Sequence, residues 1–278
     1  MARSVRDQLC WNGTLPDARD TPGVKGKAQA RKAVETIAPQ LADLQERLFA
    51  NGKLGGDKRV LLLLQGMDAS GKDGTVKHVV GQVNPAGCRI TSFGPPTKEE
   101  LGHDFLWRIT NAVPRPGQLG VFNRSQYEDV LIARVHELVP RPVWSRRYAR
   151  INAWERRLAA QGTSLIKVFL HISREEQKQR LLTRLEDPTK HWKVGAEDLR
   201  ERGLWDAYQE AYRAALTRCS TDVAPWYVVP ADRKWYRNWA ISNLLLETLT
   251  DLRLGWPTPA GVDLAAMRQQ LKDEDGPG

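Results

Sequence analysis

Residues 59–76 read RVLLLLQGMDASGKDGTV, and this stretch decides the fold. Its first part, Arg59–Gln65, is a short continuous apolar run, typical of a strand buried on both faces. A glycine-bearing loop follows at 66–74. Valines three or four residues apart then predict a helix over Thr75–Val83. Strand, glycine loop and helix in this order indicate the opening of a parallel α/β fold.

The loop has the G-x-x-x-x-G-K spacing of a phosphate-binding P-loop, which ends here at Lys72. Glycines allow successive N–H groups to turn inward around phosphate oxygens, and the helix that follows adds its positive end. The lysine offsets charge on the transferring group. A plain glycine turn with a surface lysine is the alternative, and the position between strand and helix disfavours it. We expect phosphate contacts from Gly66, Ala69, Ser70, Gly71, Asp73, Gly74, Thr75 and Lys77.

Two aspartates in this stretch bear on metal binding. A Ser or Thr that ligates Mg²⁺ normally follows the P-loop lysine, but Asp73 stands there. Asp68 lies inside the loop, where phosphates would repel its carboxylate unless a cation lay between them. Asp68 is therefore the candidate ligand for Mg²⁺, and the alternative is a loop aspartate that bonds local backbone amides.

Four more short apolar runs follow along the chain, and helical patterns separate most of them. Five strands that alternate with helices predict one doubly wound parallel sheet with right-handed crossovers. The later strands are expected at 89–93, 119–122, 165–171 and 226–229. The other helices are expected at 29–50, bent or interrupted near Pro39, and at 145–161, 174–185, 203–216 and 241–252. The ends of the chain, 1–27 and 271–278, are expected to be an irregular arm and a disordered tail.

A second motif, GVFNRSQYED (120–129), begins at the end of a predicted strand, where open α/β sheets bind their ligands. Arg124 is placed to hold phosphate with two hydrogen bonds. An acidic residue is expected there for Mg²⁺, but Asn123 is neutral. Glu128 has two interpretations of equal weight: Ser125-x-x-Glu128 is a capping box, or the carboxylate faces the site.

A third motif places Arg180 and Arg184 four residues apart, hence on one face of a helix after the fourth strand. Paired arginines at this point are typical of the mobile lid of small P-loop kinases, which brings positive charge to the site as it closes. A solvated helix face is the alternative. We divide the chain into an N-terminal arm and helix (1–57), a kinase core (58–258) with a lid at about 174–202, and a C-terminal tail (259–278).

Composition narrows the functional classes. The 278 residues include 42 Lys and Arg against 33 Asp and Glu, a net charge of +9, which favours a polyanionic partner. Three scattered cysteines without a C-x-x-C pair speak against a zinc ribbon or a disulfide framework. No apolar run approaches the roughly 20 residues of a membrane-spanning helix, and the N-terminus lacks a signal-peptide pattern. We expect a cytoplasmic protein with no membrane partner.

Together these residues resemble the polyphosphate kinase 2 family over nearly the whole chain. The matching segments are LADLQERLFA (41–50), GMDASGKDGTVKHV (66–79), PPTKEELGHDFLWRI (95–109), GVFNRSQYEDVLIARV (120–135), EEQKQRLLTRLEDPTKHWK (175–193) and APWYVVPADRKWYRN (224–238). The resemblance implies a three-layer P-loop kinase fold with a helical lid, and Mg²⁺-dependent phosphorylation of nucleotides by inorganic polyphosphate.

Carried over by position, Asp68 and Lys72 look like the essential pair of the loop, Arg124 like the arginine of the second motif, and Arg180 and Arg184 like lid residues. Many members of the family have Asp where this chain has Asn123. Asn at this position, with Glu128 five residues on, is similar to the class III subgroup, which is associated with phosphorylating both nucleoside mono- and diphosphates.

The expected function is thus reversible phosphoryl transfer from polyphosphate to adenine or guanine nucleotides, AMP to ADP and ADP to ATP. Lys72, Arg124 and the lid arginines would neutralise the transferring group, with Mg²⁺ held by Asp68. A homo-oligomer, dimer or tetramer, is expected, and no nucleic-acid partner. Two alternatives stay open: an ATP-dependent kinase on the same fold, and a non-catalytic binder of polyanions.

Overall fold

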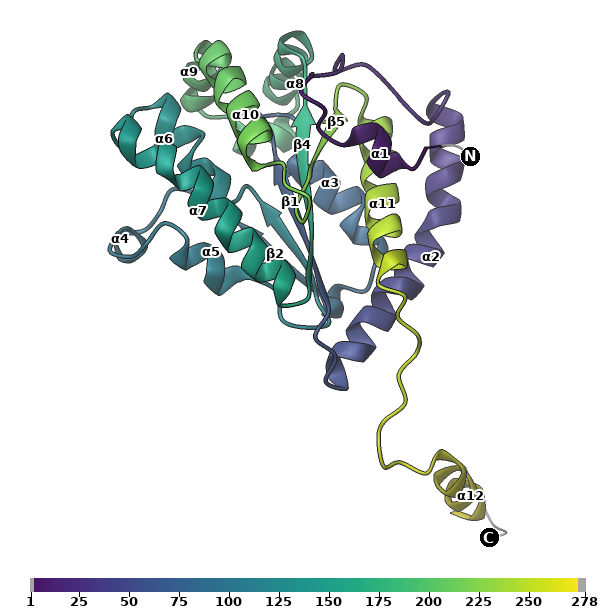
Figure 1. Cartoon of the computed structure of the whole chain (residues 1–278). Helices are drawn as coiled ribbons and strands as arrows, with labels where there is room; N and C mark the ends of the chain where they lie inside the picture. Colours follow the sequence, from purple (N-terminus) through teal and green to yellow (C-terminus); the bar gives the residue numbers. More distant parts are fainter. Residues whose placement is uncertain (1–2, 275–278) are drawn as a thin grey trace.

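Five parallel strands form a single sheet in the computed structural model, which describes residues 3–274. Their spatial order is β2-β3-β1-β4-β5 (Figure 1). The predicted strands are confirmed, with ends that agree to within about two residues. Their bounds are β1 Arg59–Gln65, β2 Cys88–Ser92, β3 Leu119–Asn123, β4 Thr163–His171 and β5 Trp226–Pro230.

Strand β1 lies in the middle of the sheet, and its apolar run is explained by burial on both faces. Leu61 and Leu63 point into one hydrophobic core, while Leu62 and Leu64 point into the other. All four side chains are fully buried. Successive side chains of a strand face opposite ways, so a strand between two helical layers needs apolar residues at every position.

Helices cover both faces of the sheet, which confirms the three-layer α/β expectation (Figure 1). One face carries α5 (Trp107–Ala112), α6 (Ile132–Val135), α7 (Arg141–Ala160) and α10 (Trp205–Cys219). The other carries α1 (Val5–Leu9), α2 (Lys27–Lys53), α3 (Lys72–His78) and α11 (Lys234–Asp251). The remaining helices are α4 (Lys98–Leu101), α8 (Arg174–Glu186), α9 (Ala196–Gly203) and α12 (Leu264–Glu274), and the 3₁₀ turns are η1 (Val80–Gln82), η2 (Pro85–Gly87), η3 (Gln126–Asp129) and η4 (Pro188–Lys193).

The N-terminal segment corrects two expectations. The arm is not irregular throughout, because α1 forms within it: Ser4 caps the helix, Leu9 is buried, and Arg6 Nε bonds Glu247 Oε2 of α11 at 3.1 Å. Helix α2 is not interrupted at Pro39. Proline removes one hydrogen bond from a helix interior, and the apolar stripe that α2 buries against α11 outweighs that loss.

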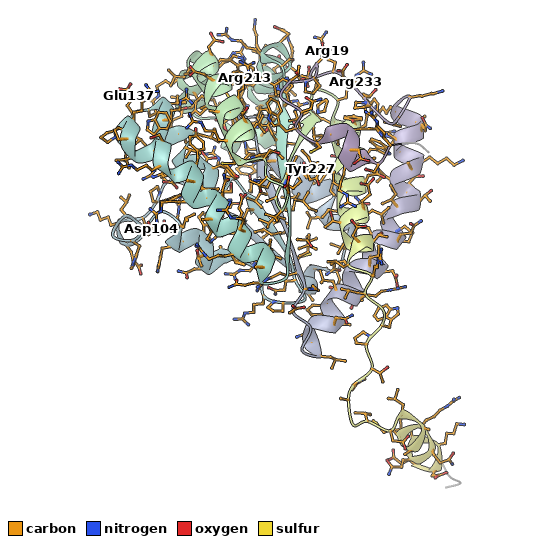
Figure 2. All side chains as sticks on the ribbon, viewed as in Figure 1. Arg19, Asp104, Glu137, Arg213, Tyr227 and Arg233 are labelled. Atoms are coloured by element: carbon orange, nitrogen blue, oxygen red, sulfur yellow. The ribbon has the colours of Figure 1, made fainter. Side chains whose placement is uncertain are left out.

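Several helix boundaries differ from the prediction, among them the start of α11, which is Lys234 where the helix was expected from 241. The helix expected at 75–83 begins at Lys72 and ends at His78, before η1. The helix expected at 203–216 is α10, which begins two residues later because the chain turns at Leu204 after α9. The expected tail is helical up to Glu274, since α12 forms there, while 275–278 lie outside the described residues. Helix α12 stands away from the body (Figures 1 and 2).

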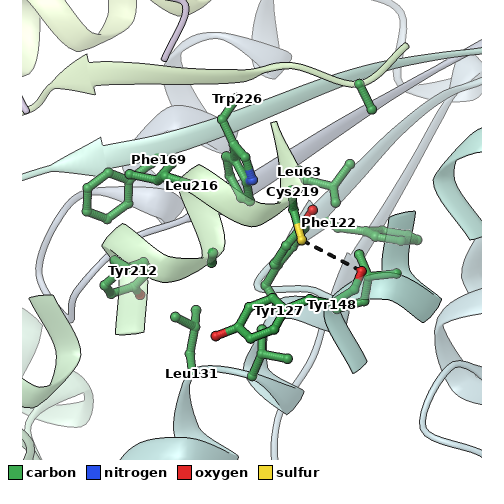
Figure 3. Packing of buried hydrophobic residues seen from close by; sticks show 14 of the residues in the cluster. Leu63, Phe122, Tyr127, Leu131, Tyr148, Phe169, Tyr212, Leu216, Cys219 and Trp226 are labelled. Carbon is green, nitrogen blue, oxygen red and sulfur yellow. Dashed lines mark hydrogen bonds between the residues drawn. The ribbon is translucent and has the colours of Figure 1, made fainter. Parts of the chain in front are cut away.

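A closed polar network lies inside the core beneath α7 and α10. Lys167 of β4 donates to Glu155 Oε2 at 2.7 Å, to Tyr127 OH at 2.9 Å and to the carbonyl oxygen of Cys219 at 2.6 Å. The rings of Tyr127 and Trp226 pack against Lys167 Nζ, with centroids 5.4 and 5.2 Å away, and edge to face against each other (Figure 3). The network holds η3, the turn after Arg124, against the sheet.

The carboxyl ends of the parallel strands meet at one edge of the sheet. The P-loop follows β1, Arg124 follows β3, and α8 follows β4 along this edge. Ligands of open α/β sheets bind outside this edge. Among residues 3–274, no helix has the length and apolar character needed to cross a membrane.

Candidate active site

A cavity of about 1270 Å³ opens at this edge of the sheet. Ten Lys and Arg residues line it against five Asp and Glu, so its interior attracts anions. The walls come from the P-loop, from the ends of β2 and β3, from α8 to α9, and from the N-terminal turns of α2 and α11. Of the predicted site residues, those that line it are Asp68, Ala69, Gly71, Lys72, Asp73, Gly74, Asn123, Arg124, Arg180 and Arg184.

Other predicted residues do not reach the cavity surface. Ser70 and Thr75 are buried beneath the loop, and Gly66 packs so tightly that an added Cβ would lie 2.8 Å from the carbonyl oxygen of Leu170. Lys77 is exposed on α3 and does not line the cavity. The reason is that a helix turns residue 77 away from the face that carries the loop, so a phosphate contact from Lys77 stays a prediction.

Helix α8 shapes the P-loop backbone. Gln177 Nε2 donates to the carbonyl oxygen of Asp68 at 3.0 Å, and Arg180 Nη1 donates to those of Ala69 and Ser70 at 2.9 and 3.0 Å. In a trans peptide the next N–H points opposite to the carbonyl. The N–H groups of Ala69 and Gly71 therefore point away from α8. Ala69 itself has a φ of 61°, a strained value for a residue other than glycine.

The two arginines of α8 differ in what they contact. All five N–H groups of Arg180 are used, since Nε bonds Glu176 at 2.8 Å and Nη2 bonds the carbonyl oxygens of Ala231 and Asp232 at 2.6 and 2.9 Å. Arg184 lines the cavity, and its side chain bonds no residue in the described range 3–274. In this conformation Arg180 braces the loop, and Arg184 is the arginine available to a ligand.

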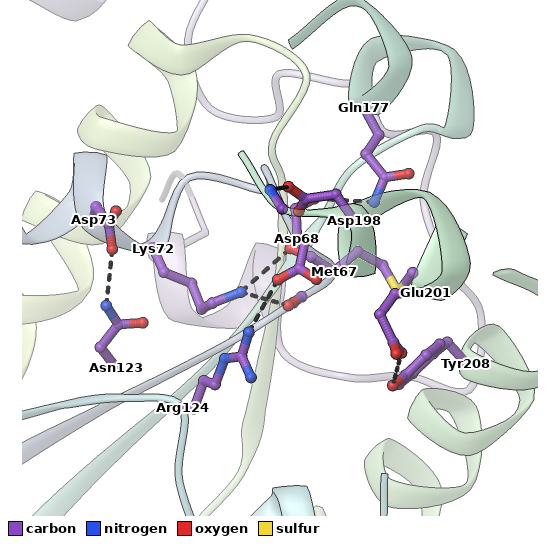
Figure 4. A network of polar contacts seen from close by, with 12 residues as sticks. Met67, Asp68, Lys72, Asp73, Asn123, Arg124, Gln177, Asp198, Glu201 and Tyr208 are labelled. Carbon is purple, nitrogen blue, oxygen red and sulfur yellow. Dashed lines mark hydrogen bonds and ion pairs between the residues drawn. The ribbon is translucent and has the colours of Figure 1, made fainter. Parts of the chain in front are cut away.

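Lys72 lies under the P-loop, where Nζ donates to the carbonyl oxygens of Gly66 at 2.7 Å and Met67 at 3.3 Å (Figure 4). Burial lowers the pKa of Lys72, and the nearby Asp68 opposes that effect. These carbonyl contacts replace part of the hydration that the buried ammonium group has lost.

Asp68 and Arg124 face each other across the mouth of the loop. Arg124 Nη2 lies 3.1 Å from Asp68 Oδ1, and both side chains keep about a third of their surface exposed. Arg124 has a φ of 65°, the left-handed region, directly after β3. Such backbone strain persists where the surroundings fix it, and here it turns the guanidinium toward the cavity.

Asp73, the residue in the usual Ser/Thr position, joins two other walls of the cavity. Its Oδ1 accepts from Asn123 Nδ2 at 2.9 Å, and its Oδ2 accepts from Lys193 Nζ of η4 at 2.7 Å. Burial acts to raise the pKa of Asp73, but these two hydrogen bonds outweigh it and lower the pKa. The neutral Asn123 is thus explained, because a carboxylate there would repel Asp73.

Glu128 does not form the predicted capping box. Ser125 Oγ accepts from the N–H of Tyr127, and residues 126–129 form a 3₁₀ turn. Oriented to match its neighbours, the Gln65 amide donates to Glu128 Oε1 at 3.0 Å and accepts from Ser125 Oγ at 2.9 Å. Burial raises the pKa of Glu128, and Arg124 and Lys72 partly offset the rise.

Several cavity residues were not singled out from the sequence. Lys27 and Arg31 of α2, and Lys234 and Arg237 of α11, form a wall beside Gly71. The signal for the α11 pair was present: Arg233, Lys234 and Arg237 follow the last strand at its carboxyl end. Nothing in the local sequence pairs α11 with α2.

Two carboxylates of the cavity bear on the binding of Mg²⁺. No group of three or more His, Cys, Asp or Glu side chains is placed to hold a metal within residues 3–274. Mg²⁺ in phosphotransferases uses one or two carboxylates, water and substrate phosphates. Asp68 and Asp73 line the same cavity, beside the P-loop lysine. The residues fit Mg²⁺ that arrives with phosphate.

Comparisons with known proteins agree with this geometry. The family model described as polyphosphate kinase 2 matches residues 25–254. The chain is 51% identical to the AMP/ADP-polyphosphate phosphotransferase of Meiothermus ruber, with 87% of this chain and 90% of that protein covered. It is 43% identical to the ADP-polyphosphate phosphotransferase of Rhodopseudomonas palustris, with 90% of each covered.

A solved structure supports the same assignment. The crystal structure of polyphosphate kinase 2 from Arthrobacter aurescens superposes with a TM-score of 0.94 at 49% identity, with 98% of each chain covered. The resemblance that the motifs carried therefore extends to the backbone of the whole molecule. The chain belongs to the polyphosphate kinase 2 family.

Proposed function

We propose that this protein transfers phosphoryl groups reversibly from inorganic polyphosphate to nucleotides, AMP to ADP and ADP to ATP. The carrying observation is the cavity in which the P-loop, Arg124 and Arg184 meet among an excess of cations. Family membership and the activities for which the two relatives are named support it. Adenine and guanine nucleotides are the proposed acceptors, and nucleic acid is not a proposed substrate.

Catalysis in this proposal is positioning and electrostatic stabilisation. Lys72 lies under the P-loop and Arg124 at its mouth, so both would oppose the charge on the oxygens of the transferring group. Arg184 adds a third cation from α8. The P-loop N–H groups, fixed by α8, hold the donor phosphate without reorganising during transfer.

Mg²⁺ is part of the proposal, with Asp68 as its protein ligand and Asp73 close by. Held by these residues, the cation would supply positive charge that reduces the repulsion between phosphates. Asp68→Asn should then lower activity and weaken its dependence on Mg²⁺ concentration. Asp57→Asn, a change at an exposed carboxylate outside the cavity, is the matched control. A normal Mg²⁺ response in Asp68→Asn would move the metal ligand elsewhere.

The use of both AMP and ADP is assigned to the acceptor side, where Asn123 and Glu128 lie. Asn123 is bonded to Asp73, and Glu128 is bonded to Gln65 behind Arg124. Arg124 then has two carboxylates near it, Asp68 at the mouth of the loop and Glu128 behind it. Asn123 and Glu128 therefore join the proposed catalytic set with Asp68, Lys72 and Arg124.

The deciding experiment is product analysis by chromatography. Purified protein is mixed with polyphosphate, Mg²⁺ and either AMP or ADP, with no nucleoside triphosphate present. Formation of ADP and ATP supports the proposal. Transfer only when ATP is the donor would favour an ordinary nucleotide kinase, and no turnover with any donor would favour a non-catalytic polyanion binder.

We also propose that the protein assembles as a homo-oligomer, a dimer or a tetramer. Helix α12 exposes Leu264, Met267 and Leu271 on one stripe, away from the body. An isolated helix of this length is marginal in water, so a second copy is a suitable surface for it. Light scattering on the full chain and on a chain ending at Pro257 measures the number of copies in each assembly. If both chains assemble into the same number of copies, α12 is not part of the interface.

A further inference from the structure

Asp232 lies in the loop between β5 and α11, and its side chain holds the start of α8. The carboxylate is buried, with 5% of its surface exposed. Its Oδ1 accepts from the backbone N–H of Ser173 at 2.8 Å, and its Oδ2 accepts from Ser173 Oγ at 2.7 Å. Ser173 is the N-cap of α8, because its Oγ accepts in turn from the N–H of Glu176 at 3.1 Å. A negative charge at this end of a helix also interacts favourably with the helix dipole.

The backbone of Asp232 holds α8 at a second point. Its carbonyl oxygen accepts from Arg180 Nη2 at 2.9 Å, about two turns along the helix from Ser173. A helix attached at one point can pivot about it, whereas two attachments to the same loop fix both its direction and its rotation. They therefore also fix the place of Arg184, which lies about one turn beyond Arg180.

The N-terminal segment supports the same loop from the other side. We call residues 11–19 the strap. The carbonyl oxygen of Ala18, a buried residue, accepts from the N–H of Asp232 at 3.1 Å, and Arg19 Nε lies 3.7 Å from Asp232 Oδ2. At its start the strap is attached to β5, where the N–H of Trp11 donates to a backbone carbonyl at 2.8 Å. The strap precedes the residues that the family model matches.

We infer that Asp232 is a positioning residue for phosphoryl transfer: seated on the strap, it fixes the base of α8 and thereby the place of Arg184 in the cavity. Asp232 itself does not line the cavity, so it acts through the helix and not on the substrate. Hydrogen bonds to a carboxylate are shorter and stronger than those between neutral groups, which suits a fixed attachment. The inference rests on the proposed function, and adds a link from the N-terminal segment to the site.

The test compares variants of the full-length protein. Asp232→Ala should lower kcat/KM for polyphosphate about fivefold, because α8 loses both bonds at Ser173 and Arg184 is placed less accurately. The KM for AMP should change less than twofold. Asp232→Asn keeps an acceptor oxygen for the Ser173 N–H and should recover part of the loss. Hydrogen exchange of the α8 amides should become faster in Asp232→Ala, while the β1 amides stay protected.

Coupling to Arg184 separates positioning from a merely structural role. In an Arg184→Gln protein, Asp232→Ala should lower kcat/KM for polyphosphate less than twofold, since the group that it positions is already absent. A fivefold loss that persists in this background overturns the inference, as does a wild-type kcat/KM in folded Asp232→Ala. If Asp232→Ala does not fold, Ser173→Ala is combined with Arg184→Gln and judged by the same two outcomes.

Glu247→Gln is the matched control. This carboxylate of α11 also holds the N-terminal segment, but its bonds go to α1: Oε1 accepts from the N–H of Val5 at 2.8 Å, and Oε2 accepts from Arg6 Nε at 3.1 Å. The variant should lower the melting temperature and leave kcat/KM and exchange in α8 unchanged. An equal loss of kcat/KM in Glu247→Gln would make general destabilisation the cause and overturns the inference. Wild-type protein that transfers nothing from any polyphosphate overturns the proposed function instead.

Discussion

Lys167 and Arg237 are both buried cations, but their surroundings differ in kind. Lys167 has its three N–H donors bonded to Glu155, Tyr127 and Cys219, and no exposed surface. Arg237 bonds only a neutral amide and keeps one nitrogen toward the cavity. The charge of Lys167 is thus compensated inside the core, whereas the charge of Arg237 is left for a ligand in the cavity to compensate. The predictions that follow test this difference.

The largest effect is expected from Lys72→Met. Loss of the ammonium removes charge stabilisation at the transferring phosphate, which should lower kcat by a factor of about 10³, or ~4 kcal/mol of barrier. The fold should persist, because Lys72 bonds only loop carbonyls. Stopped assays with AMP and polyphosphate measure the rate, and thermal melting is the control. A variant with near-normal kcat would contradict the P-loop assignment.

Lys167→Met should act on stability in place of catalysis. It leaves the Glu155 carboxylate buried without its cation, which should cost about 3 kcal/mol of unfolding free energy. Adding Glu155→Leu should recover much of the loss, because an apolar pair of similar volume replaces the ion pair. Urea unfolding at constant m-value measures both. If the Lys167→Met, Glu155→Leu double variant were less stable than Lys167→Met alone, an apolar pair could not replace this ion pair.

The same variant has a pH signature. Burial raises the pKa of Glu155, and Lys167 opposes that rise. Without Lys167 the folded pKa rises further above its value in the unfolded chain, so the folded state binds the proton more tightly. The stability deficit should therefore grow as pH increases from the ordinary carboxyl range toward neutrality. A deficit independent of pH would mean that lost packing, not charge, causes it.

Variants of the two arginines of α8 should distinguish polyphosphate binding, by Arg184, from support of the P-loop backbone, by Arg180. Arg184→Gln should lower kcat/KM for polyphosphate about tenfold, or ~1.4 kcal/mol, without changing the melting temperature. Arg180→Gln should lower both activity and melting temperature, because it releases five hydrogen bonds, among them those to Ala69 and Ser70. Equal melting temperatures for the two variants would contradict the bracing role of Arg180.

The smallest effect is expected at Glu128. Glu128→Gln keeps the shape and an acceptor oxygen beside Gln65 but removes the charge next to Arg124. It should change the ratio of AMP to ADP phosphorylation a few-fold at a near-constant melting temperature. Parallel assays with each acceptor provide the measurement. An unchanged ratio with unchanged rates would leave Glu128 a structural partner of Gln65.

Much of the sheet and of the loop was predictable because the signals are local. The apolar run of β1 and the glycine spacing up to Lys72 are contiguous in sequence, and burial confirms them. Where the sequence left two alternatives open, contacts between distant segments decide. Helix α2 continues through Pro39 because it packs on α11, and Glu128 turns from Ser125 because Gln65 of β1 lies beside it.

The sequence by itself determined the strand pattern, the P-loop, and the family to which these motifs belong, since each depends on residues close together along the chain. Only the tertiary structure decided which charged side chains are compensated within the protein and which are left to a ligand. Arg180 and Arg184 are alike in sequence, yet one meets five acceptors and the other meets the cavity. The physical reason is that a charge is compensated by whatever the fold brings within hydrogen-bond distance, and that is fixed by contacts between elements far apart in sequence.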